Sequence, residues 1–234
     1  MLVTENPPVA RASVERALEI DPELVNAHLF IAELELDDSN RENASEAIDA
    51  ALQINPGSLE ARSLRASIAY LEDRTADFDA EVARTLDVNP VYGDLYRVVG
   101  SRVARAYRFP EAVTLVRHAL ELDPNNTRAY AELVMHLLRT GDEPGARAAL
   151  ERSFDQDPFD IVTYNLLEML DQLSEFDTFE QGDLIVRIHP DESPVLKEYV
   201  IETAQQALDE LTVRYGMTIR APILVEVFPR HDDF

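Results

Sequence analysis

The sequence predicts a mostly α-helical fold: a solenoid of about four helix-turn-helix repeats, followed by a short C-terminal β-α-β segment. Two observations indicate the repeats, namely a regular series of prolines and helical spacing of apolar residues between them. The prolines lie 34 residues apart, at Pro22, Pro56, Pro90, Pro124 and Pro158. A strict period of that length is typical of stacked helical repeats. The composition agrees, because the chain has only 7 glycines and no tryptophan or cysteine.

Each interval between successive prolines holds two helical segments. After Pro22, apolar residues recur at helical spacing from Leu24 to Leu36, a polar Asp-Asp-Ser-Asn break follows, and a second helical pattern runs from Ala44 to Leu52. Small residues occupy corresponding positions where two helices must approach closely. They are Ala32, Ala66 and Gly100 in the first helices and Ala44, Ala112 and Ala146 in the second helices.

In its period, its small and large packing positions and its terminal proline, this pattern resembles the tetratricopeptide repeat (TPR) family. The resemblance implies a right-handed α-solenoid in which each repeat packs mainly on its neighbours. We expect repeats at residues 25–58, 59–92, 93–126 and 127–160, together spanning 25–160. Residues 1–24 then supply the second helix of a partial leading repeat, which suggests a start inside a longer protein.

After Pro158 the period ends. We expect a capping helix at 161–176 and the start of a truncated α/β domain at 177–234. Alternating apolar residues predict a strand at 184–189, Ser193 and Pro194 begin a long helix that Gly216 ends, and 223–228 reads as a buried strand. This β-α-β segment resembles the beginning of the catalytic domain in gluzincin-type (peptidase MA-like) zinc metallopeptidases. The resemblance implies a His-Glu-Xaa-Xaa-His motif beyond residue 234.

The net charge of -24 and the pI near 4.4 restrict the classes of partner. Nucleic acids and anionic membranes are disfavoured, because both are bound through clustered Lys and Arg. Lys197 is the single lysine, so Arg supplies nearly all the positive charge. No apolar run is long enough for membrane insertion, and no signal peptide is recognisable, but these observations do not predict a location.

The sequence contains no recognisable catalytic or zinc-binding motif. None of the five histidines has a second histidine four positions on, and there is no glycine-rich phosphate loop or nucleophile elbow. His231, Asp232 and Asp233 could together ligate a metal, but a polar loop end is the favoured interpretation. We therefore expect no catalytic residue, no metal site and no cofactor in this chain.

Candidate partner-binding residues lie on the first helices of the repeats. Arg97, Ser101, Arg105 and Arg108 are spaced by four, four and three residues, which predicts one helical stripe. Such a strip could grip an acidic segment, or its arginines could pair with the protein's own carboxylates. The set of expected concave-face residues is Leu29, Tyr70, Arg97, Ser101, Arg105, Arg108, Arg128, Met135 and Arg139.

Two functions remain open. The first is a non-catalytic protein-protein interaction scaffold that binds a peptide, a partner domain or the downstream domain of the same polypeptide on the concave face, with an acidic segment as one candidate. The second is the arm and leading edge of a zinc metallopeptidase. The Lys and Asn carboxylate clamp of chaperone-tail binders is not matched, because Arg97 and Ser101 occupy one pair of the corresponding positions.

Overall fold

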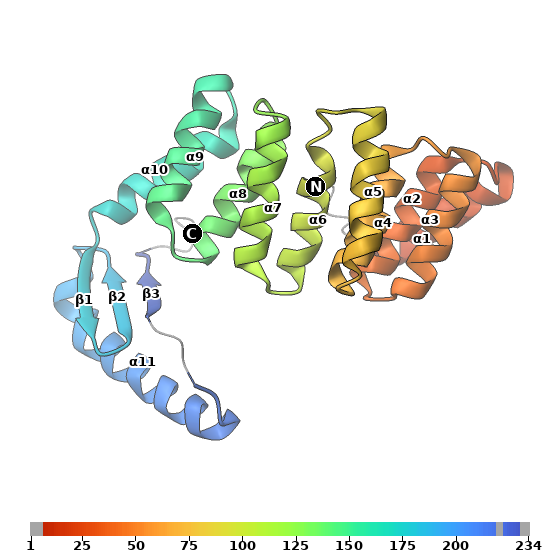
Figure 1. The fold of residues 1–234 in the computed structure, drawn as a ribbon. Helices are drawn as coiled ribbons and strands as arrows, with labels where there is room; N and C mark the ends of the chain where they lie inside the picture. Colours follow the sequence, from red (N-terminus) through yellow and green to blue (C-terminus); the bar gives the residue numbers. More distant parts are fainter. Residues whose placement is uncertain (1–6, 219–221, 230–234) are drawn as a thin grey trace. The chain divides into compact units, whose positions relative to one another are not determined.

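The computed structural model describes residues 7–218 and 222–229, which form helices followed by a small sheet and one long helix (Figure 1). The first ten helices are α1 (Pro7–Ile20), α2 (Val25–Asp37), α3 (Arg41–Ile54), α4 (Leu59–Leu71), α5 (Thr75–Val88), α6 (Asp94–Arg105), α7 (Phe109–Leu122), α8 (Thr127–Arg139), α9 (Glu143–Gln156) and α10 (Ile161–Ser174). The remaining elements are β1 (Asp177–Gln181), β2 (Leu184–Ile188), α11 (Ser193–Tyr215) and β3 (Ile223–Val227). The predicted fold class, helical repeats followed by short strands, is confirmed.

The chain divides into two compact units, residues 1–140 and residues 141–234. In the first unit, consecutive helices pack as antiparallel hairpins: α2 with α3, α4 with α5, and α6 with α7. The first helices also form a continuous row, because α2 contacts α4, α4 contacts α6, and α6 contacts α8. This row exists because each helix has an apolar face wide enough for both its hairpin partner and the next repeat.

The periodic prolines all occupy the same turn. Each lies two residues after a helix end, and the Asp or Asn before it accepts a hydrogen bond from the backbone N–H two residues on, at 3.0–3.2 Å. This Asx turn satisfies a backbone donor that the broken helix leaves without a partner. The residue before proline is extended, as at Asn55 with ψ 90°, which matches the restriction that a proline ring imposes. The five prolines therefore mark the ends of α1, α3, α5, α7 and α9.

A second repeated feature is the turn that follows the first helix of each repeat, after α2, α4, α6 and α8. At this position the backbone enters the left-handed region at Ser39 (φ 62°), Asp73 (φ 55°), Tyr107 (φ 60°) and Gly141 (φ 78°). These residues are also 34 apart, yet only the last is glycine, the residue that adopts this conformation without steric cost.

The apolar core of the first unit is built around the small residues that the sequence analysis singled out. Ala32 and Ala44 are fully buried in one cluster with Ile48 and Leu64, and Ala66 and Ala112 are buried in a second with Val99. At Gly100 the helices approach so closely that a Cβ atom would lie 2.8 Å from Val116 Cγ2. Any larger residue at this position would require the Val116 side chain to shift.

The second unit contains α9 and α10, which pack together, and a three-stranded sheet of order β1-β2-β3 covered by α11. The two predicted strands are present as β2 and β3, which pair in parallel in a register that places Val186 opposite Val225. Strand β1 was not predicted: it pairs antiparallel with β2 through a two-residue loop, Gly182 and Asp183. Gly182 has φ 58°, and a positive φ at the first loop residue is what a type II′ hairpin turn requires. The segment is therefore β-β-α-β rather than β-α-β.

Helix α11 begins at Ser193 and is ended by Gly216 in the left-handed conformation, as predicted. The apolar residues along α11 form a wide stripe that is only partly buried. Val200, Ala204 and Leu208 pack on the buried face of the sheet, but Tyr199 and Tyr215 are 68% and 67% exposed. A helix lying on three strands buries a narrow face, which leaves the edges of a wide stripe in solvent.

Across residues 7–218 and 222–229, no helix is both long enough and apolar enough to cross a membrane.

Candidate partner-binding surface

The candidate site is the row of first helices in the first unit, here called the first-helix surface and defined by α2, α4, α6 and α8. All the predicted partner-binding residues except Arg108 lie on these helices. Leu29 is half-buried on α2 and packs against the apolar cluster that contains Ile48. On α4, the Tyr70 hydroxyl donates to Glu111 Oε2 at 3.1 Å, and its ring meets Phe78 edge-on. Both residues therefore serve the packing of the unit itself.

The predicted arginine stripe is interrupted. Helix α6 ends at Arg105, Tyr107 turns the chain in the left-handed conformation, and Arg108 occupies the N-cap position of α7. Arg108 therefore does not continue the α6 stripe, and the prediction of one four-member stripe is wrong. Its guanidinium binds Glu111 and lies 5.4 Å from the Tyr70 ring centroid, which fixes the turn between the two helices.

Arg97 is held between two carboxylates. Its Nε lies 2.6 Å from Asp94 Oδ1, and its Nη1 lies 2.7 Å from Glu132 Oε1 on α8. Burial alone would raise the pKa of Asp94, but hydrogen bonds from Arg97 and Asn126 lower it. Burial raises the pKa of Glu132 despite the arginine, and Glu132 Oε2 has no hydrogen-bond partner among the described residues. This network joins α6 to α8.

Arg105 also pairs within the protein. Its Nη1 lies 2.6 Å from Oδ1 of Asp37, a residue at the end of α2 that also binds Arg102. Sequence reasoning missed Arg102, because its partner is 65 residues away and no local spacing reveals it. Ser101 is half-buried on α6, between Arg97 and Arg105 in the sequence. Arg97, Arg105 and Arg108 therefore pair with the protein's own carboxylates, which is the second of the two alternatives from the sequence analysis.

Helix α8 differs from the other first helices. Arg128 and Arg139 are exposed and have no carboxylate within ion-pair distance among residues 7–218 and 222–229, although the charge of Arg128 helps to lower the pKa of Asp94. Met135 between them is 41% exposed. The spacings of seven and four residues place all three on one side of the helix. The Arg139 guanidinium lies 5.4 Å from the centroid of the Phe109 ring, so an aromatic face supports it and leaves its donors available.

His136 is a buried residue of α8. It is 4% exposed, and neither ring nitrogen has a hydrogen-bond partner among the described residues. Burial, with a smaller contribution from the positive charge of Arg139, lowers the pKa of His136 to about 4. The imidazole is therefore neutral at pH 7 and packs as an apolar side chain.

The described residues contain no group of three or more His, Cys, Asp or Glu side chains arranged to hold a metal ion. The metal ligands considered at His231, Asp232 and Asp233 lie outside the described residues.

The hairpins of the first unit and the repeated turn define a class of protein, the stacked helical-hairpin repeat proteins. Two models of the tetratricopeptide repeat match the sequence, one at residues 2–58 and the other at residues 104–170. The chain therefore contains tetratricopeptide repeats, a scaffold fold typical of protein-protein interaction. No curated protein matches the chain.

Solved structures of other proteins resemble this chain at low sequence identity. TTC0263, a thermophilic TPR protein of Thermus thermophilus, is 19% identical, with a TM-score of 0.50 over 70% of this chain and 90% of its own. Yeast Tom70 is 16% identical, with a TM-score of 0.53 over 70% of this chain and 36% of its own. PilW, a type IV pilus biogenesis factor, is 23% identical, with a TM-score of 0.44 over 70% of this chain and 76% of its own. These comparisons do not show a similarity between the C-terminal segment and gluzincin-type metallopeptidases.

Proposed function

We propose that this chain is a non-catalytic interaction scaffold that binds an acidic peptide segment on the first-helix surface, centred on α8. The observation that carries the proposal is the contrast between two sets of arginines. Arg97 and Arg105 bind the protein's own carboxylates, whereas Arg128 and Arg139 make no ion pair among the described residues. In a chain of net charge -24, two exposed arginines that form no direct ion pair, beside an exposed methionine, are suited to a ligand that supplies carboxylates.

The geometry of α8 sets the spacing of the ligand's charges. Arg128 and Arg139 are 11 positions apart in the sequence, which corresponds to about 16 Å along a helix axis. An extended peptide covers that length in about five residues. Side chains alternate between the two faces of an extended peptide, so an even spacing is needed to place both charges on one face. We therefore expect two acidic side chains four residues apart, with an apolar side chain midway between them for Met135.

The test is fluorescence anisotropy with a labelled peptide that carries two glutamates at this spacing and a central leucine. The double variant Arg128→Gln/Arg139→Gln should weaken binding by about tenfold or more, because each lost charge-assisted contact is worth roughly 1 kcal/mol. The control Arg16→Gln/Arg152→Gln removes the same charge from exposed arginines elsewhere. If both double variants weaken binding equally, the change in net charge explains the effect. That result would contradict the assigned surface.

The second function from the sequence analysis stays a proposal with its own support. The parallel pair of β2 and β3 joined by α11 is the arrangement that the resemblance to gluzincin-type metallopeptidases implies. If the repeats are the arm of such an enzyme, a His-Glu-Xaa-Xaa-His motif follows residue 234 in the parent gene. Sequencing that gene tests this function, and a downstream sequence without the motif would contradict it.

A further inference from the structure

Strand β1 in the second unit is a sheet edge. Among the described residues it pairs with β2 alone, and four of its five residues are exposed. Its register with β2 begins at Gln181 and Leu184, which flank the two-residue loop and form a hydrogen-bonded pair. Pairs alternate along an antiparallel ladder, so Asp177, Phe179 and Gln181 bond to β2. Thr178 and Glu180 then direct their backbone N–H and C=O groups to the open side.

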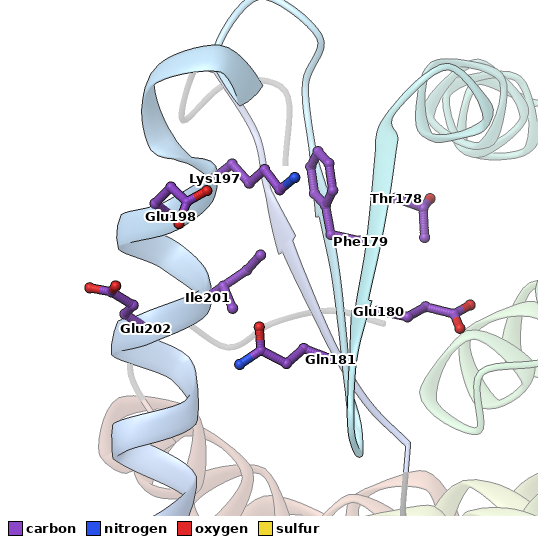
Figure 2. Close-up of a pocket in the computed structure, with 8 residues that line it drawn as sticks. All are labelled: Thr178, Phe179, Glu180, Gln181, Lys197, Glu198, Ile201 and Glu202. Carbon is purple, nitrogen blue, oxygen red and sulfur yellow. The ribbon is translucent and has the colours of Figure 1, made fainter.

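A groove lies beside this edge, between β1 and α11, with a volume of about 570 Å³ (Figure 2). Phe179 and Gln181 point from the strand toward the helix, and Ile201 points from the helix toward the strand. The Lys197 ammonium lies 4.4 Å from the centroid of the Phe179 ring, where the two side chains form one wall. Glu198 and Glu202 contribute the outer rim from α11.

A free strand edge beside a helix is the geometry that accepts an extended peptide as an added strand. The backbone groups of Thr178 and Glu180 would supply the hydrogen bonds, and alternate side chains of the peptide would enter the groove. Both requirements, an unpaired edge and space on one face for every second side chain, are met at β1.

Charge selects the occupant. Glu198 and Glu202 are exposed and make no ion pair among the residues that the structure describes, and Glu180 adds a further negative charge at the edge. Lys197 offsets one of these charges. A second copy of the chain would bring the same acidic strand and a further net charge of -24, and acidic side chains at an edge oppose such pairing. A basic extended segment has the complementary charge.

We propose that β1 and α11 form a second docking site, which takes an extended basic peptide as a fourth strand beside β1. The segment pairs with the open backbone groups of Thr178 and Glu180 and places alternate Lys or Arg side chains near Glu198 and Glu202. This site is independent of the acidic-peptide surface on α8, because it lies in the other unit and has the opposite charge preference.

The probe is a labelled short peptide in which lysine alternates with valine, titrated into the whole chain. Three comparison peptides separate the contributions: a version with glutamate for lysine, a version with the same residues in blocks, and a version N-methylated at alternate positions. We expect binding of the alternating basic peptide only. Tight binding of the acidic or the N-methylated version, or no binding of the basic peptide, overturns the proposal.

Two variants test the protein side. Thr178→Pro removes one outward N–H without removing a bond to β2, since proline is tolerated where the N–H of an edge strand faces solvent. It should weaken binding by about tenfold, whereas Thr178→Val keeps the N–H and should not. Glu198→Gln/Glu202→Gln should also weaken binding and make it less dependent on salt. The proposed site is wrong if the double glutamine variant binds the basic peptide with unchanged affinity. It is equally wrong if Thr178→Pro, with unaltered circular dichroism, binds with unchanged affinity. Salt-resistant dimers that Thr178→Pro abolishes would instead assign the edge to a second copy.

Discussion

Arg97 and Glu132 join two first helices of the repeat unit, with Nη1 of the arginine 2.7 Å from Oε1 of the glutamate. The pair is unequal, because Arg97 also binds Asp94 while Glu132 Oε2 has no partner among the described residues. Removing one partner of a buried pair leaves the other charge uncompensated. The two residues should therefore respond very differently to substitution.

We predict that Arg97→Met destabilises the protein by about 2 kcal/mol, because it leaves two carboxylates without their counter-ion. Glu132→Gln should change stability by less than about 1 kcal/mol, since burial already raises the pKa of Glu132 and disfavours its charged form. Urea unfolding of both variants at pH 7 measures the difference. Equal losses from the two substitutions would contradict this account of the network.

The buried His136 should make stability depend on pH. Its folded pKa of about 4 lies below the usual value of 6.5, so folding favours the neutral form. The stability that it contributes is complete above pH 6.5 and is lost as the pH falls toward 4. The difference between the unaltered chain and His136→Leu should change by about 3 kcal/mol across this window. A constant difference from pH 7 to pH 4 would show that His136 titrates normally.

The repeated left-handed turn predicts opposite effects at two corresponding positions. Ser39→Gly should stabilise the protein by about 1 kcal/mol, because Ser39 is exposed and its φ of 62° is costly for a residue with a Cβ. Gly141→Ala should destabilise by a similar amount, because its φ of 78° is costly for alanine. No atom would obstruct the new methyl group, so the loss would come from the backbone conformation. Thermal unfolding measures both shifts, and shifts of the same sign would refute the strain argument.

Close packing at Gly100 gives a further prediction. Gly100→Ala should destabilise by about 2 kcal/mol, because the added Cβ would lie 2.8 Å from Val116 Cγ2 in the buried interface of α6 and α7. Gly57→Ala is the matched control, since its Cβ would make only an ordinary contact with the Asn55 side chain. Chemical denaturation of the two variants should separate them clearly. Similar stabilities would mean that the Val116 side chain adjusts at little cost.

The sequence predicted the helical part well because proline and helix periodicity are local signals. The prolines at 34-residue intervals mark a turn that depends only on the Asp or Asn before them. Strand β1 was missed because Phe179 is the sole apolar residue in Asp177–Gln181, so no alternation indicated a strand. The adjacent Gly182 and Asp183, a two-residue hairpin signal, could have revealed it.

The candidate site was harder to predict, because its charges pair over long distances in the sequence. Asp37 binds Arg105 from 68 residues away, and Glu132 binds Arg97 from 35 residues away. Spacing along one helix identifies which arginines share a face but not which carboxylates meet them. The left-handed turn at Tyr107, which removes Arg108 from the α6 stripe, had no glycine to mark it. The partner-binding role of these residues stays a prediction.

The most direct test of the proposed acidic-peptide surface is a double-mutant cycle between Arg139 and a glutamate of the bound peptide. Affinities are measured for the unaltered chain and Arg139→Gln, each with the glutamate peptide and with its glutamine analogue. If the side chains meet, the two changes are not additive, and the coupling energy is about 1 kcal/mol or more. The same cycle is measured for Arg128. If neither Arg139 nor Arg128 shows a coupling energy with any glutamate of the peptide, binding on α8 is contradicted.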